Sequence, residues 1–530
     1  MASKIKVDTL ETANGSGSIT INNPINTAGI TSVTLGTSNF VAGVNSGNSI
    51  TSGGNYNTTI GDEAGTAITT GDNNVAVGYN SLTANTTGTD SVAIGHSALL
   101  AQTTGGDNVA IGHLAMSSLT TAGNNTAVGD RAMQANTSGE NNVAIGTLAL
   151  DANTTGASNT AVGRDSLGAN TTGTRNTAVG TNSLIANTTA NDNTAVGYNA
   201  LNANTTGAEN TAVGKEALTA NTTGTLNTAV GQGALSTSTT ADNNTAVGRL
   251  ALGAATTGGN NTATGFQALR LNTTGNANAA FGLYAMLYNT TGIQNVAVGM
   301  SALESNTTAS YNTAVGYSSL PANTTGQYNV ANGYESLKAN TTGNGNIGIG
   351  KQAGDIVTSG DYNIFVGPST RGSSSTNDQE IVIGTQGGGN VVGKGSNTGY
   401  IQPNGGGMYQ GNNSASWAQT SDERLKKNIV NNDVGLAKIN AIQVRNFDYK
   451  TAEEVESDGV LDSHQAVAKT GTQLGVIAQE LELVCPESVK TESTGIKTIS
   501  ADNLHWHMIN AIKELSAKND ALETQNATFA

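Results

Sequence analysis

The sequence predicts an all-β fold, a parallel β-solenoid of 17-residue coils, followed by a small α+β domain that ends in a coiled-coil helix. Three observations support this prediction. A glycine recurs every 17 residues from Gly61 to Gly384, which makes 20 coils without insertion or deletion. Charged residues become frequent at 421, and from about 500 apolar residues repeat every seven. A strict period indicates units of equal circumference that contact only their neighbours.

The composition excludes several classes of protein. The 530 residues carry a net charge of −15, and only 12% of them are charged and 4% aromatic. The acidic charge argues against a nucleic-acid partner. No run of about 20 apolar residues exists that could span a membrane, and the N-terminal residues lack the apolar segment of a secretory signal. We expect no cofactor and no metal, and the single Cys485 excludes an intrachain disulfide.

Each coil has a fixed pattern when its ladder glycine is taken as position 0. Positions −3 and −1 are usually Val, Ile or Thr around a small residue, as in Val75-Ala76-Val77. This alternation predicts a short strand with one buried face. Position +4 is Leu or Met, as in Leu82. We therefore expect two short strands per coil and about three aliphatic side chains pointing inward. Twenty coils at about 4.8 Å predict a rod of roughly 95 Å.

Two polar positions repeat with the same period. Position −4 is Asn in 18 of the 20 coils, with Ser91 and Glu380 as the exceptions. Stacked Asn side chains can hydrogen-bond along the rod. A second turn reads Asn-Thr-Thr-Gly, as at 85–88, where we expect the Gly to supply a positive φ. The same tripeptide is a glycosylation sequon, but its strict period favours a ladder of turns.

The flanks of the repeat divide the rest of the chain. Residues 1–56 are out of register and are predicted to be an N-terminal attachment region, and residues 57–384 form the shaft. Residues 385–420 form a Gly/Asn-rich linker or β tip in which Tyr400, Tyr409 and Trp417 could act as anchors. The coils at 60–65 and 349–354 share a Gly in place of the +4 Leu, and we expect them to be terminal caps.

The repeat units Asn-Asn-Val-Ala-Ile-Gly (141–146) and Asp-Ser-Val-Ala-Ile-Gly (90–95) resemble the head repeats of trimeric autotransporter adhesins. The resemblance covers about 57–384. It implies a left-handed parallel β-roll packed as a homotrimer. Those adhesins have a signal peptide and a membrane anchor, and we expect neither here.

Residues 421–530 resemble the intramolecular chaperone domain of phage tailspikes and tail fibres, the peptidase S74 family. The matching features are Ser421-Asp422-x-Arg424-Leu425-Lys426-x-Asn428-Ile429, then Gly-Val-Ile-Ala-Gln-Glu at 475–480, and a terminal helix. The resemblance implies that Ser421 is a nucleophile and Lys426 its base, and that the chain is cut once, between Thr420 and Ser421. Asp422 and Arg424 are expected to fix the geometry by ion pairing.

The dyad is chemically coherent, because a Ser hydroxyl needs an adjacent base and Lys becomes one only if its pKa falls from about 10.4. Lys427 is a competing base, and Lys426 is favoured by its spacing. The alternative is a solvated basic stretch that opens a helix with Ser421 as its N-cap.

The terminal helix carries two heptad rows, Leu504/Ala511/Lys518 and Met508/Leu515/Leu522. They predict a coiled coil over 501–526. The alternative is an amphipathic helix packed on its own domain. His505, Trp506 and His507 are expected to pack, since no metal-ligand spacing includes them.

These features together predict a phage tail fibre or virion appendage, made in the host cytoplasm. The rod would attach to a host receptor, possibly a glycan, with its N-terminus bound to other tail or baseplate proteins. The first alternative is a polysaccharide depolymerase tailspike, which would need paired acids in a groove. The rod's acids, such as Asp90, Glu140 and Asp151, are scattered. A second alternative is an ice-binding solenoid that uses the Thr-Thr ladder.

Overall fold

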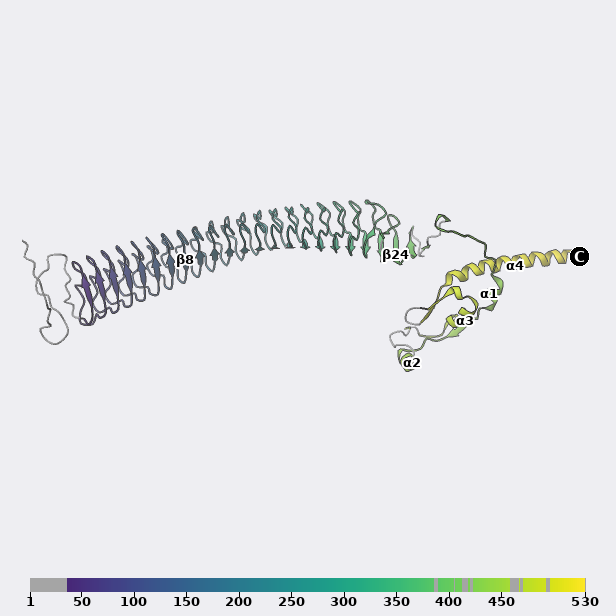
Figure 1. The fold of residues 1–530 in the computed structure, drawn as a ribbon, viewed down its shortest axis with the longest axis horizontal. Coiled ribbons are helices and arrows are strands. Elements are labelled where there is room, and N and C mark those ends of the chain that lie inside the picture. The colour runs from purple at the N-terminus through teal and green to yellow at the C-terminus, as the bar shows by residue number, and fades with distance from the viewer. Residues whose placement is uncertain are drawn as a thin grey trace, which may run out of the picture. The chain divides into compact units, whose positions relative to one another are not determined.

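The computed structural model describes residues 36–529, apart from 386–388, 405, 412–417, 420–422, 458–466, 468–469 and 492–495. Residues 1–35 and Trp417 therefore lie outside the described part. The chain divides into two compact units, residues 1–420 and 421–530. Each unit is described by itself (Figure 1).

The first unit is a parallel β-solenoid in which each coil contributes one short strand to a single ladder (Figure 1). Adjacent strands pair in register, for example Thr194 with Thr211 and Val196 with Val213. The ladder strands are β1 (Phe40–Ala42), β2 (Thr58–Ile60), β3 (Val75–Val77), β4 (Val92–Ile94), β5 (Val109–Ile111), β6 (Thr126–Val128), β7 (Val143–Ile145), β8 (Thr160–Val162), β9 (Thr177–Val179), β10 (Thr194–Val196), β11 (Thr211–Val213), β12 (Thr228–Val230), β13 (Thr245–Val247), β14 (Thr262–Thr264), β15 (Ala279–Phe281), β16 (Val296–Val298), β17 (Thr313–Val315), β18 (Val330–Asn332), β19 (Ile347–Ile349), β20 (Ile364–Val366), β22 (Ile381–Gly384) and β24 (Gly399–Asn404).

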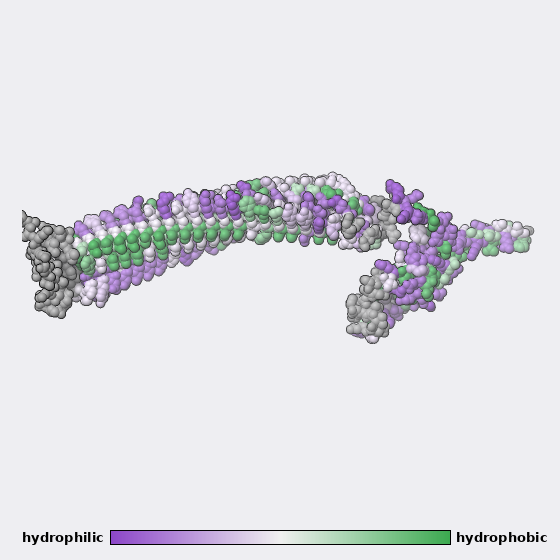
Figure 2. All heavy atoms as spheres, in the orientation of Figure 1, coloured by the Kyte–Doolittle hydropathy of each residue, from purple (hydrophilic) through white to green (hydrophobic). Residues whose placement is uncertain are grey.

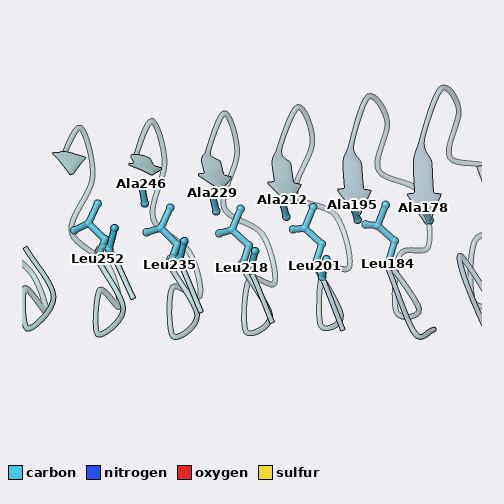
Figure 3. Packing of buried hydrophobic residues seen from close by; sticks show 14 of the residues in the cluster. Ala178, Leu184, Ala195, Leu201, Ala212, Leu218, Ala229, Leu235, Ala246 and Leu252 are labelled. Carbon is cyan, nitrogen blue, oxygen red and sulfur yellow. The ribbon is translucent and has the colours of Figure 1, made fainter. Parts of the chain in front are cut away.

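In each strand the small middle residue points into the core, whereas the prediction placed the larger aliphatic side chains there. In β10 the side chain of Ala195 is fully buried, whereas Thr194 and Val196 lie on the outer face and are only half-buried. Leu184, from the preceding coil, lies across the core from this alanine, and Figure 3 shows the facing rows of Ala and Leu repeated along the rod. The coil is too narrow for a large side chain from both walls. The interior of a coil is therefore Ala plus Leu or Met, not three aliphatic side chains.

The wall opposite the strand is a chain of turns, so the prediction of two strands per coil is wrong. In the part of the coil that follows β10, positive φ angles occur at Gly197 (138°), Asn199 (54°) and Leu201 (50°). A strand requires φ near −120°. The left-handed conformation at +4 turns the Leu side chain into the core.

The predicted Asn ladders are confirmed, and both are buried. Asn142 donates from its backbone N to Asn125 Oδ1 at 3.0 Å, and from Nδ2 to the carbonyl of Gly156 at 2.9 Å. In the Asn-Thr-Thr-Gly turn, Asn153 Nδ2 donates to Asn136 Oδ1 at 2.9 Å. These side chains have no exposed surface. The interpretation of Asn-Thr-Thr as part of a ladder of turns, and not as a glycosylation site, is thus correct, because a glycan could not be attached to a buried amide.

The Gly of the Asn-Thr-Thr-Gly turn does not supply a positive φ, contrary to the prediction. At Gly88 the φ is outside the left-handed region, and an added Cβ would instead collide with the carbonyl oxygen of Gly105 in the next coil. The ladder glycines differ. Gly95 has φ 133°, and its Cβ would lie 2.5 Å from the oxygen of Gly112. The ladder glycine is explained by close approach and φ together. The turn position can adjust to a Cβ, because Ala122, Ala190, Ala241 and Ala309 occupy it in other coils.

The ladder continues beyond both predicted caps. β1 pairs with β2, and β22 pairs with β24, each with an offset of 18 residues instead of 17. One extra residue in a turn hid these coils from the periodic pattern. The coils with Gly65 and Gly354 are therefore internal. Both glycines have positive φ, like the Leu that they replace, and Ile68 and Phe365 fill the core beside them.

The C-terminal end of the rod turns into an antiparallel ribbon. β24 pairs with β25 (Gly406–Gln410), which pairs with β26 (Ala418–Gln419), while β21 (Thr370–Arg371) pairs with β23 (Val391–Val392). Tyr400 is 6% exposed and packs with Tyr409 on the end of the core, as predicted for these anchors. The buried Glu380, which replaces the ladder Asn, accepts a hydrogen bond from Gly395 N at 2.8 Å. An antiparallel ribbon here covers the last open edge of the core.

The second unit is α+β. Its described helices are η1 (Glu423–Leu425), α1 (Leu436–Ala441), α2 (Ala452–Ser457), α3 (Ala478–Val484), η3 (Pro486–Ser488) and α4 (Ala501–Phe529). Two antiparallel pairs join β27 (Arg445–Phe447) to β28 (Gln473–Gly475) and β29 (Val489–Thr491) to β30 (Lys497–Ile499). No helix in the described part of the chain is both long and apolar enough to cross a membrane.

The terminal helix α4 behaves differently along its length. Its first half packs on α1, and His507 and Ala511 are buried there. From Ile512 onward its large apolar side chains are exposed, including Leu515 at 59% and Leu522 at 57%. The packed-helix alternative thus holds for the first half, and the second half keeps the unpartnered heptad row that a coiled coil requires.

Candidate processing junction and C-terminal unit

The predicted processing residues cluster at the division between the two units, which falls between Thr420 and Ser421. Thr420, Ser421 and Asp422 lie outside the described residues. Arg424 lies in η1, and Lys426 follows it, with its backbone N donating to the Glu423 carbonyl at 2.9 Å. The pairing of Ser421 with Lys426 stays a prediction.

Lys426 is exposed in this single chain. A lysine becomes a base near neutral pH when burial or neighbouring cations lower its pKa. Burial of Lys426 would therefore have to come from something that covers this surface. Arg424 is also exposed in the single chain.

The segment that follows the junction is held by one face of α4. Asn510 Nδ2 donates to the Asn432 carbonyl at 2.6 Å, and His507 Nδ1 lies 2.8 Å from the Val434 carbonyl oxygen. The Glu514 carboxylate accepts hydrogen bonds from the backbone N of Gly435 at 2.8 Å and of Leu436 at 3.2 Å. A carboxylate at the start of α1 stabilises the unpaired N–H groups there. The terminal helix therefore fixes the chain shortly after the predicted cut.

A second polar cluster joins α1, η3 and α4. The Glu487 carboxylate accepts hydrogen bonds from Lys438 Nζ and interacts with His507 Nε2 at 2.8 Å. The Lys438 ammonium is the main cause that lowers the pKa of Glu487 to about 2. Burial raises the pKa of the Cys485 thiol beside it. Sequence analysis did not connect these residues, because Cys485 and Glu487 are far from His507 along the chain.

The three residues expected to pack on the terminal helix have different environments. His507 is 5% exposed and has acceptors at both ring nitrogens. Trp506 is 65% exposed, and His505 is exposed as well. The packing prediction is therefore correct for His507 and wrong within this chain for the other two, because the helix turns them away from the unit.

The outside of the rod carries an apolar band, which Figure 2 shows in green most clearly over the N-terminal half of the shaft. We name the residues at position −1 of each coil, from Ile60 to Ile383, the outer row. It is aliphatic or aromatic in 18 of 20 positions, with Thr264 and Asn332 as exceptions. Members such as Ile94, at 37% exposed, stack in register on the next strand. Monomeric proteins rarely expose an apolar patch beyond roughly 300–600 Å².

A parallel β-solenoid followed by a small α+β unit with a long terminal helix fits the architecture of tail fibres and tailspikes. Comparison with known families supports this class: residues 421–490 match the family model of the peptidase S74 chaperone of endosialidase. The match begins at the predicted nucleophile and covers the segment held by α4. No curated protein and no solved structure matches the chain.

Proposed function

We propose that this protein is a trimeric tail fibre or related virion appendage whose C-terminal unit acts as an intramolecular chaperone and is released by self-cleavage. The observation that carries the proposal is the chaperone-family match, which begins at Ser421, where the second compact unit also begins. A rod of many identical coils needs chains in register before the coils form, and non-local β structure folds slowly. A C-terminal chaperone that assembles first would supply this register.

The outer row is the proposed contact between chains. Its residues are apolar, run the length of the shaft and keep one register, so three copies could bury them against one another along a common axis. The exposed row of Met508, Leu515 and Leu522 on α4 would extend the same assembly into the C-terminal unit. Both surfaces stay partly exposed in one chain, and burying them is the source of stability that assembly would add.

The proposed cut uses Ser421 and Lys426 without a cofactor. Lys426 Nζ, as the neutral amine, takes the proton from Ser421 Oγ, which attacks the carbonyl carbon of Thr420. The C–N bond breaks as Lys426 returns the proton to the leaving nitrogen, and the Thr420 acyl group is left on Oγ as an ester. Water hydrolyses that ester, giving a Thr420 carboxylate and a free Ser421 hydroxyl. Covering of the exposed Lys426 by neighbouring chains would make it a base only after assembly.

The test is the intact mass of freshly purified wild-type protein beside Ser421→Ala. We expect fragments 1–420 and 421–530 from the wild type and one uncut chain from the variant. Lys426→Met and Lys427→Met should separate the two candidate bases, with only the first blocking cleavage. An uncut wild type that is trimeric would leave the C-terminal unit as a permanent trimerisation domain.

The proposed role in the virion follows from this architecture. The mature rod, residues 1–420, would attach to a host surface receptor, and its N-terminal region would bind tail or baseplate proteins. Adding purified rod to host cells before infection should reduce adsorption of the parent particle. Unchanged adsorption at saturating rod would contradict the attachment role.

A further inference from the structure

The C-terminal unit brings together three side chains with the donor atoms of a transition-metal site. Cys485 and Glu487 flank the start of η3, and His507 lies on α4. One ligand atom from each, Sγ, a carboxylate oxygen and a ring nitrogen, all lie within 4.8 Å of one another. Cys485 has no exposed surface and His507 only 5%. This cluster is separate from the processing junction.

The surroundings of His507 orient it as a ligand. A backbone carbonyl can only accept, so the contact of 2.8 Å with the Val434 oxygen places a hydrogen on Nδ1. Nε2 then faces the Glu487 carboxylate at 2.8 Å. Two lone pairs at this distance repel, so a positive charge is needed between them: a proton or a metal ion. A carbonyl that accepts from the far nitrogen is the usual partner of a metal-bound histidine.

The site also has room for a fourth ligand. A pocket of about 480 Å³ opens onto Glu487 and His507, with Asn503 and Trp506 among its other lining residues. Zinc is held by thiolate, imidazole and carboxylate in four-coordinate sites, and a site with three protein ligands takes water as the fourth. A thiolate disfavours magnesium and calcium, which bind oxygen ligands.

We propose that Cys485, Glu487 and His507 bind one zinc ion in the C-terminal unit. Binding releases two protons to solvent, the Cys485 thiol proton and the proton held between His507 Nε2 and Glu487. The ion then takes the Nε2 lone pair of His507, whose Nδ1–H keeps its bond to Val434. The ion would join η3 to α4 and, through Val434, to the segment after the processing junction. Lys438 must turn away from Glu487, because its ammonium competes with the metal for the same carboxylate oxygen. The Lys438 side chain is 27% exposed, which gives it a route to solvent.

The test uses the full-length Ser421→Ala chain, so that the unit stays attached whether or not the wild type cleaves. The chain is stripped with a chelator and dialysed against Zn²⁺, and bound metal is measured by elemental mass spectrometry. We expect one zinc per chain. Co²⁺ in its place should give the absorption of a tetrahedral site with a sulfur-to-cobalt charge-transfer band.

The variants make the proposal specific. Cys485→Ser should abolish the charge-transfer band, and it and His507→Gln should each weaken zinc binding about tenfold or more. His505→Gln, on the exposed side of the same helix, is the matched control and should change nothing. Lys438→Met keeps every ligand and should tighten binding, which tests the site even if a ligand variant fails to fold. The proposal is overturned if the parent chain holds no more zinc than the Cys485→Ser/His507→Gln variant, if cobalt shows no sulfur band, or if Lys438→Met does not tighten binding.

Discussion

The rod and the C-terminal unit bury their apolar residues in opposite ways. Each coil of the rod closes its own interior, with Ala and Leu or Met side chains at zero exposure from one end to the other. In the described part of the C-terminal unit the only buried apolar side chains are Leu481, Cys485 and Ala511. Large apolar residues there are open to solvent, such as Val430 at 84% and Leu483 at 88% exposed.

The buried interior therefore stabilises the rod within one chain, whereas the exposed apolar side chains of the C-terminal unit are available for contacts between chains. The rod's interior needs only the next coil, so its stability is a sum of neighbouring contacts. The described part of the C-terminal unit leaves many large apolar side chains open to solvent, which is a property of domains that are stable only when associated. The unit that buries fewer apolar side chains within one chain is thus the one proposed to bring the chains together.

We expect the strongest effect from variants of the terminal helix α4. Leu515→Ser with Leu522→Ser removes the exposed heptad row of α4 while leaving the rod untouched. We expect loss of the trimer and of self-cleavage, measured by light scattering after size exclusion and by intact mass. Glu523→Gln on the same helix is the control. A double variant that assembles and cleaves like the wild type would show that this row is not the contact.

The second prediction compares the ladder glycine with the glycine of the Asn-Thr-Thr-Gly turn. Gly197→Ala places a Cβ 2.6 Å from the Gly214 oxygen at φ 138°, and we expect it to destabilise the surrounding coils by more than the roughly 1–3 kcal/mol of backbone strain alone. Gly207→Ala should cost far less, because Ala190 and Ala241 occupy that position in other coils. Hydrogen exchange of the neighbouring strands measures the difference. Equal losses of protection would contradict the distinction.

A smaller effect concerns the buried amides. Asn153→Ala removes the two buried hydrogen bonds that Asn153 Nδ2 donates, to Asn136 Oδ1 and to the Gly156 carbonyl, which costs about 1–3 kcal/mol. Each acceptor keeps one other donor, Gly139 N and Asn142 Nδ2. Asn153→Gln should lose less, because Gln102 occupies the same position and donates to Gly105 O at 2.7 Å. Denaturant unfolding of the two variants beside the wild type gives the order. Reversal of that order would contradict the ladder as a stabilising element.

The smallest expected effect is a pH dependence of one surface pair on the rod. Hydrogen bonds from Lys338 and then Gln352 lower the pKa of Glu335 from its ordinary 4.5 to about 2. A lowered folded-state pKa stabilises the protein fully above pH 4.5, and this contribution is lost as the pH falls toward 2. Glu335→Gln should therefore lower the Tm slightly at neutral pH and not at pH 2. Lys338→Met should remove most of the difference, and a constant difference at all pH values would contradict the assignment.

Local patterns predicted much of the rod correctly. The glycine period gave the parallel coils, and the Asn at position −4 gave the buried ladder. The prediction of which strand face points into the core was wrong. The alternation in Val75-Ala76-Val77 separates two faces, but it does not determine which face is buried. Larger side chains usually point inward, but Leu82 already fills this coil from the other wall. The ends were missed because one added residue shifts the period while β1 still pairs with β2.

The repeating β rod, its hydrogen-bonded Asn positions, the change of domain at Ser421 and the terminal helix could be predicted from the sequence, because each is a local or periodic property of the chain. The three-dimensional structure was needed to show that the outer row lies outside the rod, that Ile68 and Phe365 replace a missing Leu, and that His507 meets Cys485 and Glu487. These features depend on the space left between segments and on contacts between residues distant in the chain, and no single stretch of sequence determines either of them.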